Sequence, residues 1–126
     1  MPLVRVSLRQ GKSADYKKAI GDGVYRAMIE TFAVPKEDRF VVISEHAESE
    51  LQFSGTYLDI ARSDDLVIIQ ITANNTRTVE QKKALFARIA ELLSQHTGLR
   101  KEDVFINLVD VAKENWSFGN GIAQYA

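Results

Sequence analysis

The residue best suited to acid–base chemistry in this sequence is Pro2, which directly follows the initiator methionine. Met1 is commonly removed when a small residue follows it, and its removal would leave Pro2 with a free secondary amine. An α-amino group titrates near ~8 in model peptides, and an apolar pocket lowers that pKa by disfavouring the ammonium form. Such an amine can accept or donate a proton near neutral pH. A Met-Pro start is common, so the rest of the chain must supply the reason to assign Pro2 a function.

The composition limits the classes of function that are open to this chain. Its 126 residues, 45% hydrophobic and 26% charged, fit one globular domain over 1–126. A net charge of −1 without a local Lys/Arg cluster argues against a nucleic-acid partner. The lack of cysteine excludes thiolate and zinc–cysteine chemistry, and the two histidines are far apart, so we expect no metal and no cofactor. No apolar stretch approaches the ~20 residues of a membrane span, and Arg5, Arg9 and Lys12 interrupt any signal-peptide core, so we expect a cytoplasmic protein without a membrane partner.

The elements that would hold Pro2 in place follow from the apolar pattern. Apolar runs predict four strands, at residues 3–8, 39–44, 66–72 and 104–109. Apolar residues at helical spacing predict a helix over 14–33, with Ser13 as its N-cap. A second helix begins after Thr78, which forms a capping box with Gln81, and ends before Gly98.

The two halves of the chain repeat each other at a constant offset of 65 positions. The matched segments are Lys17-Lys18-Ala19-Ile20 with Lys82-Lys83-Ala84-Leu85, Lys36-Glu37-Asp38-Arg39-Phe40 with Lys101-Glu102-Asp103-Val104-Phe105, and Ser13 with Thr78. We therefore expect two β-α-β units, 1–63 and 64–126, each with a right-handed crossover between parallel strands. Together they predict an α/β (α+β) fold, a four-stranded mixed sheet with both helices on one face. The bare opposite face predicts an oligomer.

The repeat also bears on Pro2. Its counterpart at the same offset is Val67, which lies in the middle of the chain. Only the first unit can therefore offer a free amine, and we expect one active site per chain.

Taken together, these features resemble the tautomerase superfamily, and within it the branch of malonate semialdehyde decarboxylase. The residues that carry the resemblance are Met1-Pro2-Leu3, Val34-Pro35-Lys36-Glu37-Asp38-Arg39-Phe40, Arg62-Ser63, Arg77 ahead of Glu80-Gln81-Lys82, and Asn115-Trp116-Ser117-Phe118-Gly119. The resemblance spans nearly the whole chain, and it implies the tautomerase fold and a homotrimer of duplicated chains.

The resemblance also implies roles for individual residues. Pro2 would be the catalytic amine, Asp38 would position water or substrate beside it, and Arg77 would bind a substrate carboxylate. Trp116 and Phe118 would wall the pocket and keep the amine pKa low. The decarboxylase pattern has a second arginine just before the second helix. Here that position falls on Asn75, with Asn74 beside it, and an asparagine can hydrogen-bond a carboxylate but carries no charge.

Each of these residues also has a purely structural alternative. Asp38 and its repeat counterpart Asp103 could stabilise turns. Arg77 precedes a helix N-terminus, where a positive charge is unfavourable, and this position indicates a specific role. Trp116 and Phe118 alternate on a predicted strand that turns through a Gly-Asn-Gly hairpin, and they could be core or interface residues.

We therefore expect an enzyme that uses Pro2 for keto–enol tautomerisation of a small 2-oxo acid resembling phenylpyruvate. The alternative within the same fold is cofactor-free decarboxylation of a 3-oxo acid such as malonate semialdehyde. A third possibility is a non-enzymatic binding protein, like the cytokine branch of the superfamily. In both enzymatic cases the partner is a small carboxylate-bearing substrate.

Overall fold

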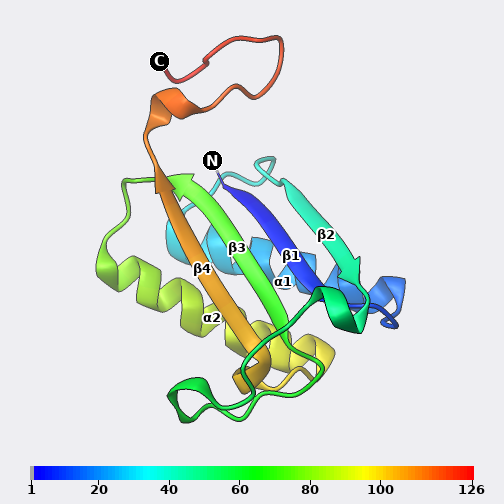
Figure 1. The fold of residues 1–126 in the computed structure, drawn as a ribbon. Helices are drawn as coiled ribbons and strands as arrows, with labels where there is room; N and C mark the ends of the chain where they lie inside the picture. The colour runs from blue at the N-terminus through cyan, green and yellow to red at the C-terminus, as the bar shows by residue number, and fades with distance from the viewer. Residues whose placement is uncertain (1) are drawn as a thin grey trace.

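The computed structural model describes residues 2–126, so the predicted removal of Met1 lies outside the described residues. The elements run in the order β1 (Leu3–Arg9), α1 (Ala14–Phe32), β2 (Val41–His46), β3 (Val67–Asn74), α2 (Val79–Thr97) and β4 (Val104–Val111). The strands form one sheet in the order β2-β1-β3-β4. β1 is parallel to β2, β3 is parallel to β4, and the central pair β1 and β3 is antiparallel. Figure 1 shows both helices on the same face of this mixed sheet, which confirms the predicted architecture.

Side chains at the helix ends explain where both helices begin. The Oγ of Ser13 accepts a hydrogen bond from the backbone N–H of Tyr16 at 3.1 Å. Thr78 and Gln81 form the predicted capping box, with N···O distances of 3.1 and 2.9 Å. α2 ends at Gly98 in the left-handed region, with a φ of 74°, where glycine carries no steric penalty.

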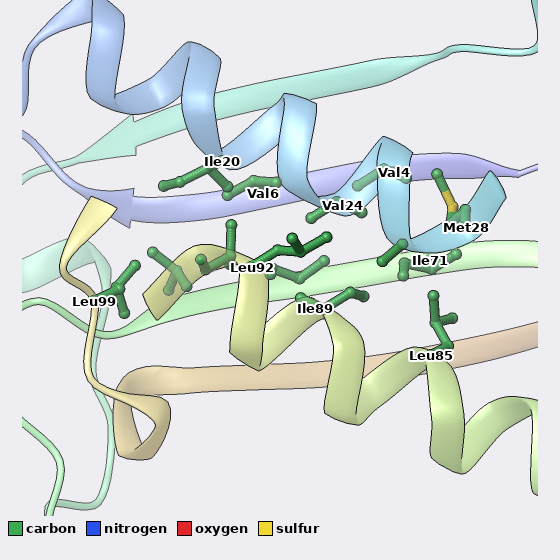
Figure 2. Packing of buried hydrophobic residues seen from close by; sticks show 14 of the residues in the cluster. Val4, Val6, Ile20, Val24, Met28, Ile71, Leu85, Ile89, Leu92 and Leu99 are labelled. Atoms are coloured by element: carbon green, nitrogen blue, oxygen red, sulfur yellow. The ribbon is translucent and has the colours of Figure 1, made fainter. Parts of the chain in front are cut away.

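The core lies between the sheet and the two helices. Alternate residues of each strand point to this side, and they meet the apolar faces of α1 and α2 (Figure 2). Labelled examples are Val4, Val6 and Ile71 from the sheet, and Ile20, Val24, Met28, Leu85, Ile89 and Leu92 from the helices. This arrangement requires apolar residues to recur every two positions in the strands and about every 3.6 positions in the helices. The sequence has this pattern.

The internal repeat is visible in the contacts as well as in the elements. α1 and α2 have the same length of 19 residues. Each helix is tied to the strand that follows it by an ion pair, Lys17 with Glu45 at 2.5 Å and Lys82 with Asp110 at 2.8 Å. The two pairs occupy equivalent positions in the two units, so the repeat extends to surface side chains.

The C-terminal tail differs from the prediction. Beyond β4 the chain forms a short 3-10 turn at Lys113–Asn115 and then irregular turns, and the predicted strand and hairpin are wrong. A strand needs a neighbour to pair with, and β3 has already ended at Asn74, opposite Val111. The tail therefore leaves the sheet at the end of β4, projects beyond it and loops back on itself (Figure 1).

The sheet face opposite the helices carries exposed apolar side chains. Phe40, Val42, Phe105 and Val109 are all more than a third exposed. Their neighbours Val41, Val104 and Leu108 pack against the core, so the exposed residues face the other way. Within the described chain, neither helix is long and apolar enough to cross a membrane.

Candidate active site

The topology brings four chain segments to one edge of the sheet, the one at which β1 begins and at which β3 and β4 end. Because β1 and β3 are antiparallel and pair Leu3 with Thr72, the start of β1 lies beside the end of β3. The backbone N–H of Val4 donates to the carbonyl of Phe40 at 2.9 Å, which places the segment before β2 on the other side of β1. The tail leaves β4 at the same edge.

Pro2 lies at this edge, in the wall of a cavity of about 240 Å³. The other lining residues are Leu3, Phe40, Trp116, Ser117 and Phe118. Pro2 is itself buried, and the rings of Trp116 and Phe118 stack with centroids 5.4 Å apart and an interplanar angle of 19°. Three of the residues singled out from the sequence therefore share one largely apolar pocket.

Asn74 fixes the position of Trp116. The indole Nε1–H donates to the Oδ1 of Asn74 at 2.8 Å, and Asn74 is 7% exposed at the end of β3. The next residue, Asn75, has an exposed side chain, and its backbone N–H donates to the carbonyl of Val111 at 3.0 Å. The sequence interpretation chose Asn75 and missed Asn74. The signal available in the sequence was a polar residue at the end of a predicted strand. A buried side-chain amide there needs a hydrogen-bond partner.

The tail beyond Phe118 closes on itself through a second aromatic contact. The ring of Tyr125 meets the ring of Phe118 edge-on, with centroids 5.1 Å apart. The side-chain amide of Gln124 accepts a hydrogen bond from the N–H of Phe118 at 2.9 Å and donates to the carbonyl of Gly119 at 3.0 Å. The sequence interpretation missed both Gln124 and Tyr125, which hold the pocket wall in a compact loop.

Asp38 lies two residues before Phe40, at the same edge, and is 6% exposed. Its backbone N–H donates to the carbonyl of Pro35 at 3.0 Å in a tight turn. Burial raises the pKa of the Asp38 carboxyl above its ordinary value, while the positive charge of Arg77 acts in the opposite direction. Asp38 therefore interacts electrostatically with Arg77, and neither residue is among those that line the cavity at Pro2.

Arg77 reaches back from the segment before α2 to the end of α1. Its Nη2 donates to the carbonyl of Phe32 at 3.1 Å, and its guanidinium carbon lies 4.8 Å from the centroid of the Phe32 ring. α1 has no basic residue in its own last turn, and a cation near the last carbonyls of a helix is favourable. The unfavourable position of Arg77 before α2 is thus offset by a favourable one at the end of α1.

Comparisons with known proteins decide the family. A family model described as "Tautomerase enzyme" matches residues 38–119, and a second model with the same description matches residues 2–60. The chain belongs to the tautomerase family. It is 43% identical over 124 residues to the probable tautomerase YusQ of Bacillus subtilis (strain 168), a match that covers 98% of each chain. It is also 31% identical to the probable tautomerase YrdN of the same organism, over 99% of this chain and 96% of that protein.

Solved structures place the fold of this tautomerase near malonate semialdehyde decarboxylase. One such structure, described in terms of decarboxylase and hydratase activities, has a TM-score of 0.92 and 29% identity, and the match covers 98% of this chain and 95% of that one. The FG41 malonate semialdehyde decarboxylase inhibited by 3-bromopropiolate has a TM-score of 0.91 and 37% identity, over 98% and 93% of the two chains. A fused 4-OT, described as a symmetric trimer, shares the fold with a TM-score of 0.80 and 22% identity, over 98% and 97%.

The chain is therefore an enzyme of the tautomerase family. Among residues 2–126, no three His, Asp or Glu side chains are grouped so as to hold a metal ion. The cavity itself offers Pro2 and the aromatic wall of Trp116 and Phe118, whereas the carboxyl of Asp38 and the guanidinium of Arg77 lie outside its lining.

Proposed function

We propose that this tautomerase uses the amine of Pro2, freed by removal of Met1, as the proton carrier in keto–enol tautomerisation of a small 2-oxo acid with an aryl or apolar body. The observation that carries the proposal is the burial of Pro2 in a cavity of about 240 Å³ walled by Trp116 and Phe118. An apolar wall disfavours the ammonium form and keeps a fraction of the amine neutral near pH 7.

The reaction requires one proton to leave the substrate and one to return. The neutral amine takes the proton from the carbon next to the carbonyl, and the electrons of that C–H bond form the enol double bond. The proton then reaches the carbonyl oxygen, and the amine is neutral again. The reverse sequence converts an enol to its ketone, and the substrate is isomerised with no net gain or loss of atoms.

The charged groups at the same edge have complementary roles in this proposal. Arg77 binds the substrate carboxylate, because a guanidinium can donate two parallel hydrogen bonds to it. Asn75 adds a neutral hydrogen bond from its exposed position just after β3. Asp38 orients the amine and the substrate through its charge, which explains why a carboxyl is kept in a buried position where its pKa is raised.

Decarboxylation of a 3-oxo acid such as malonate semialdehyde is the second candidate. The similarity to two malonate semialdehyde decarboxylase structures, at 37% and 29% identity, supports it. In this reaction a protonated Pro2 donates a hydrogen bond to the carbonyl at position 3. The bond to the carboxylate carbon then breaks, carbon dioxide leaves, and the enolate that remains takes up a proton to give the aldehyde. We place it second because Asn75 carries no charge where the decarboxylase pattern has an arginine.

We further propose that the chain works as a homotrimer. The exposed apolar residues Val42 and Val109 of the open sheet face would be covered by neighbouring copies. The fused 4-OT that shares the fold is described as a symmetric trimer. Sedimentation at micromolar concentration tests this directly, and a stable monomer would contradict it.

The test of the activity compares three forms of the protein with phenylenolpyruvate as substrate, following ketonisation by its ultraviolet absorbance. The first is the wild type, with removal of Met1 verified by mass spectrometry. The second is Pro2→Ala, for which we expect kcat/KM to fall by ~100-fold or more, the usual scale of general acid–base catalysis. The third carries one additional, uncleaved residue before Pro2 and should be equally impaired, because its proline nitrogen is an amide.

Turnover that is unchanged in both altered forms would rule out the proline mechanism. Malonate semialdehyde, assayed with the same three forms for release of acetaldehyde, then separates the two candidate reactions. The favoured assignment predicts that the wild type has the higher kcat/KM with phenylenolpyruvate.

A further inference from the structure

The internal repeat produces a second cavity at the opposite edge of the sheet, where β3 and β4 begin. Its volume is about 230 Å³, close to that of the pocket at Pro2. Four of its lining residues stand 65 positions from four lining residues of the first pocket: Gln52 from Ser117, Phe53 from Phe118, Ile68 from Leu3, and Phe105 from Phe40. The apolar walls of the two cavities are therefore related by the duplication.

The residues that we assign to the reaction, Pro2, Asp38 and Arg77, have repeat counterparts near the second cavity that cannot take the same roles. Val67 replaces Pro2 and lies within a paired strand. The carboxylate of Asp103, the counterpart of Asp38, accepts two hydrogen bonds of 2.6 Å from the backbone N–H and the hydroxyl of Ser63. Lys12, the counterpart of Arg77, is ion-paired with Asp65 at 2.7 Å. The second cavity keeps the apolar walls and has lost the proton carrier.

The second cavity also has a charged group that the repeat does not supply. Arg62 lines it, and its Nη1 donates to the carbonyls of Tyr57 at 3.0 Å and Ser54 at 3.2 Å, with a longer bond to Ile60. These carbonyls hold the guanidinium in place but do not neutralise it. Among the ion pairs formed by the described residues, none includes Arg62. The cavity thus combines apolar walls with a cation that has no carboxylate partner inside the described chain.

We propose that this second pocket, lined by Phe53, Ile68, Phe105 and Arg62, is a non-catalytic binding site for a small monocarboxylic acid with an aryl or apolar body. The body of the ligand would bury its surface against the three apolar side chains, and its carboxylate would neutralise Arg62. A site of this kind would be occupied independently of Pro2, and each chain would hold two acid molecules at saturation.

The test uses 3-phenylpropionate, which has no 2-oxo group and cannot tautomerise, in an NMR titration of the full-length protein. The indole N–H of Trp116, the single tryptophan, reports on the first pocket. The backbone amides of Phe53 and Ile68 report on the second. We expect saturable shifts at Phe53 and Ile68 in the wild type, and a calorimetric stoichiometry of two per chain.

Two matched variants assign the binding events. Ile68→Trp fills the second cavity and should abolish the response of Phe53 while leaving the response of Trp116. Leu3→Trp makes the same change at the repeat-related position and should have the opposite effect. If Trp116 does not respond and Phe53 does, the proposed catalytic pocket fails and the second site stands.

A second, independent experiment tests the role of the ligand's carboxylate and needs no cavity-filling variant. 3-Phenylpropanol has the same body without the carboxylate and should bind the second site about tenfold more weakly or worse. Arg62→Gln keeps a donor for the loop carbonyls but removes the charge, and it should weaken 3-phenylpropionate by a similar factor. The proposal is overturned if Phe53 and Ile68 show no saturable shift, if Ile68→Trp leaves the shift of Phe53 intact, or if the acid and the alcohol bind equally.

Discussion

The indole N–H of Trp116 donates a 2.8 Å hydrogen bond to the side-chain oxygen of Asn74, a residue 42 positions earlier at the end of β3. This bond joins the C-terminal tail to the sheet beside Pro2. The tail has no strand pairing of its own, so this side-chain hydrogen bond helps to hold the aromatic wall over the pocket.

Asn74→Ala should release this wall while leaving the catalytic groups in place. We expect kcat/KM for phenylenolpyruvate to fall by about 2- to 10-fold, the equivalent of one hydrogen bond of ~0.5–1.5 kcal/mol, and the fluorescence of Trp116 to shift to the red. Asn75→Ala is the matched control, since its side chain is exposed. It should raise KM for the acid without changing the Trp116 emission. Wild-type emission and activity in Asn74→Ala would show that the bond has no role.

The repeat-related acids Asp38 and Asp103 should separate activity from stability. Asp103 is fully buried and accepts two short bonds from Ser63, so Asp103→Asn should lower the free energy of unfolding by about 1.5–3 kcal/mol. Asp38→Asn should lose less stability and most of the activity. Urea unfolding and kcat/KM of the two variants measure both effects, and the reverse pattern would contradict the assignment of Asp38 to the site.

The stability of the wild type relative to Asp38→Asn should also depend on pH. Because burial raises the pKa of Asp38, the folded protein holds the carboxyl proton more tightly than the unfolded chain does. Ionising Asp38 therefore costs stability as the pH rises from its unfolded pKa of ~3.9 through the higher folded value. Relative to Asp38→Asn, the wild type should gain stability on acidification from about pH 7 to about pH 3. A relative loss on acidification would mean that the folded state favours the carboxylate.

Arg77 should affect both the substrate and the fold. Arg77→Ala removes the proposed carboxylate contact, which is worth about 1.5–3 kcal/mol, and should lower kcat/KM by roughly 10- to 100-fold, mainly through KM. It also removes the bond to the Phe32 carbonyl and the contact with its ring, so the melting temperature should fall. Arg77→Lys keeps the charge and should recover stability more than activity, because an ammonium cannot donate two parallel bonds. Equal recovery of both would argue for a structural role alone.

Two glycines of α1 provide a test of the helix packing that supports the site. A Cβ at Gly21 would sit 3.6 Å from Arg39, whereas a Cβ at Gly23 would come within 2.9 Å of the buried Leu93 of α2. Gly21→Ala should therefore stabilise the protein by about 0.5–1 kcal/mol through helix propensity alone. Gly23→Ala should be neutral or destabilising by about 1–2 kcal/mol, since overpacking offsets that gain. Equal stabilisation by both would contradict the close approach of α1 and α2.

The fold could be predicted from the sequence because its determinants are local and occur twice. The caps at Ser13 and Thr78 and the alternation of apolar residues in β1 depend on near neighbours, so the structure confirms them. His96 shows the limit of such patterns: it stands at helical spacing from the buried Leu85, Ile89 and Leu92, but the last turn of α2 leaves it exposed.

The site could be predicted only in part, because several of its contacts join distant segments. Pro2, Trp116 and Phe118 line one cavity. The partner of Trp116 is 42 positions away, and Arg77 reaches Phe32 from 45 positions away. No local pattern marks such pairs. The conformation of the tail is likewise decided by where β3 ends, which is a property of the assembled sheet.

The central claim concerns the protonation of Pro2, and a ¹⁵N NMR titration of its nitrogen in the processed protein tests it most directly. Proton transfer by a neutral amine predicts a pKa near or below 7, under the ~8 of an ordinary α-amino group, because the pocket is apolar. In Asp38→Asn the value should fall further, since a neighbouring carboxylate favours the ammonium form. A pKa well above 8 would contradict the base mechanism and favour the ammonium role of the decarboxylation reaction.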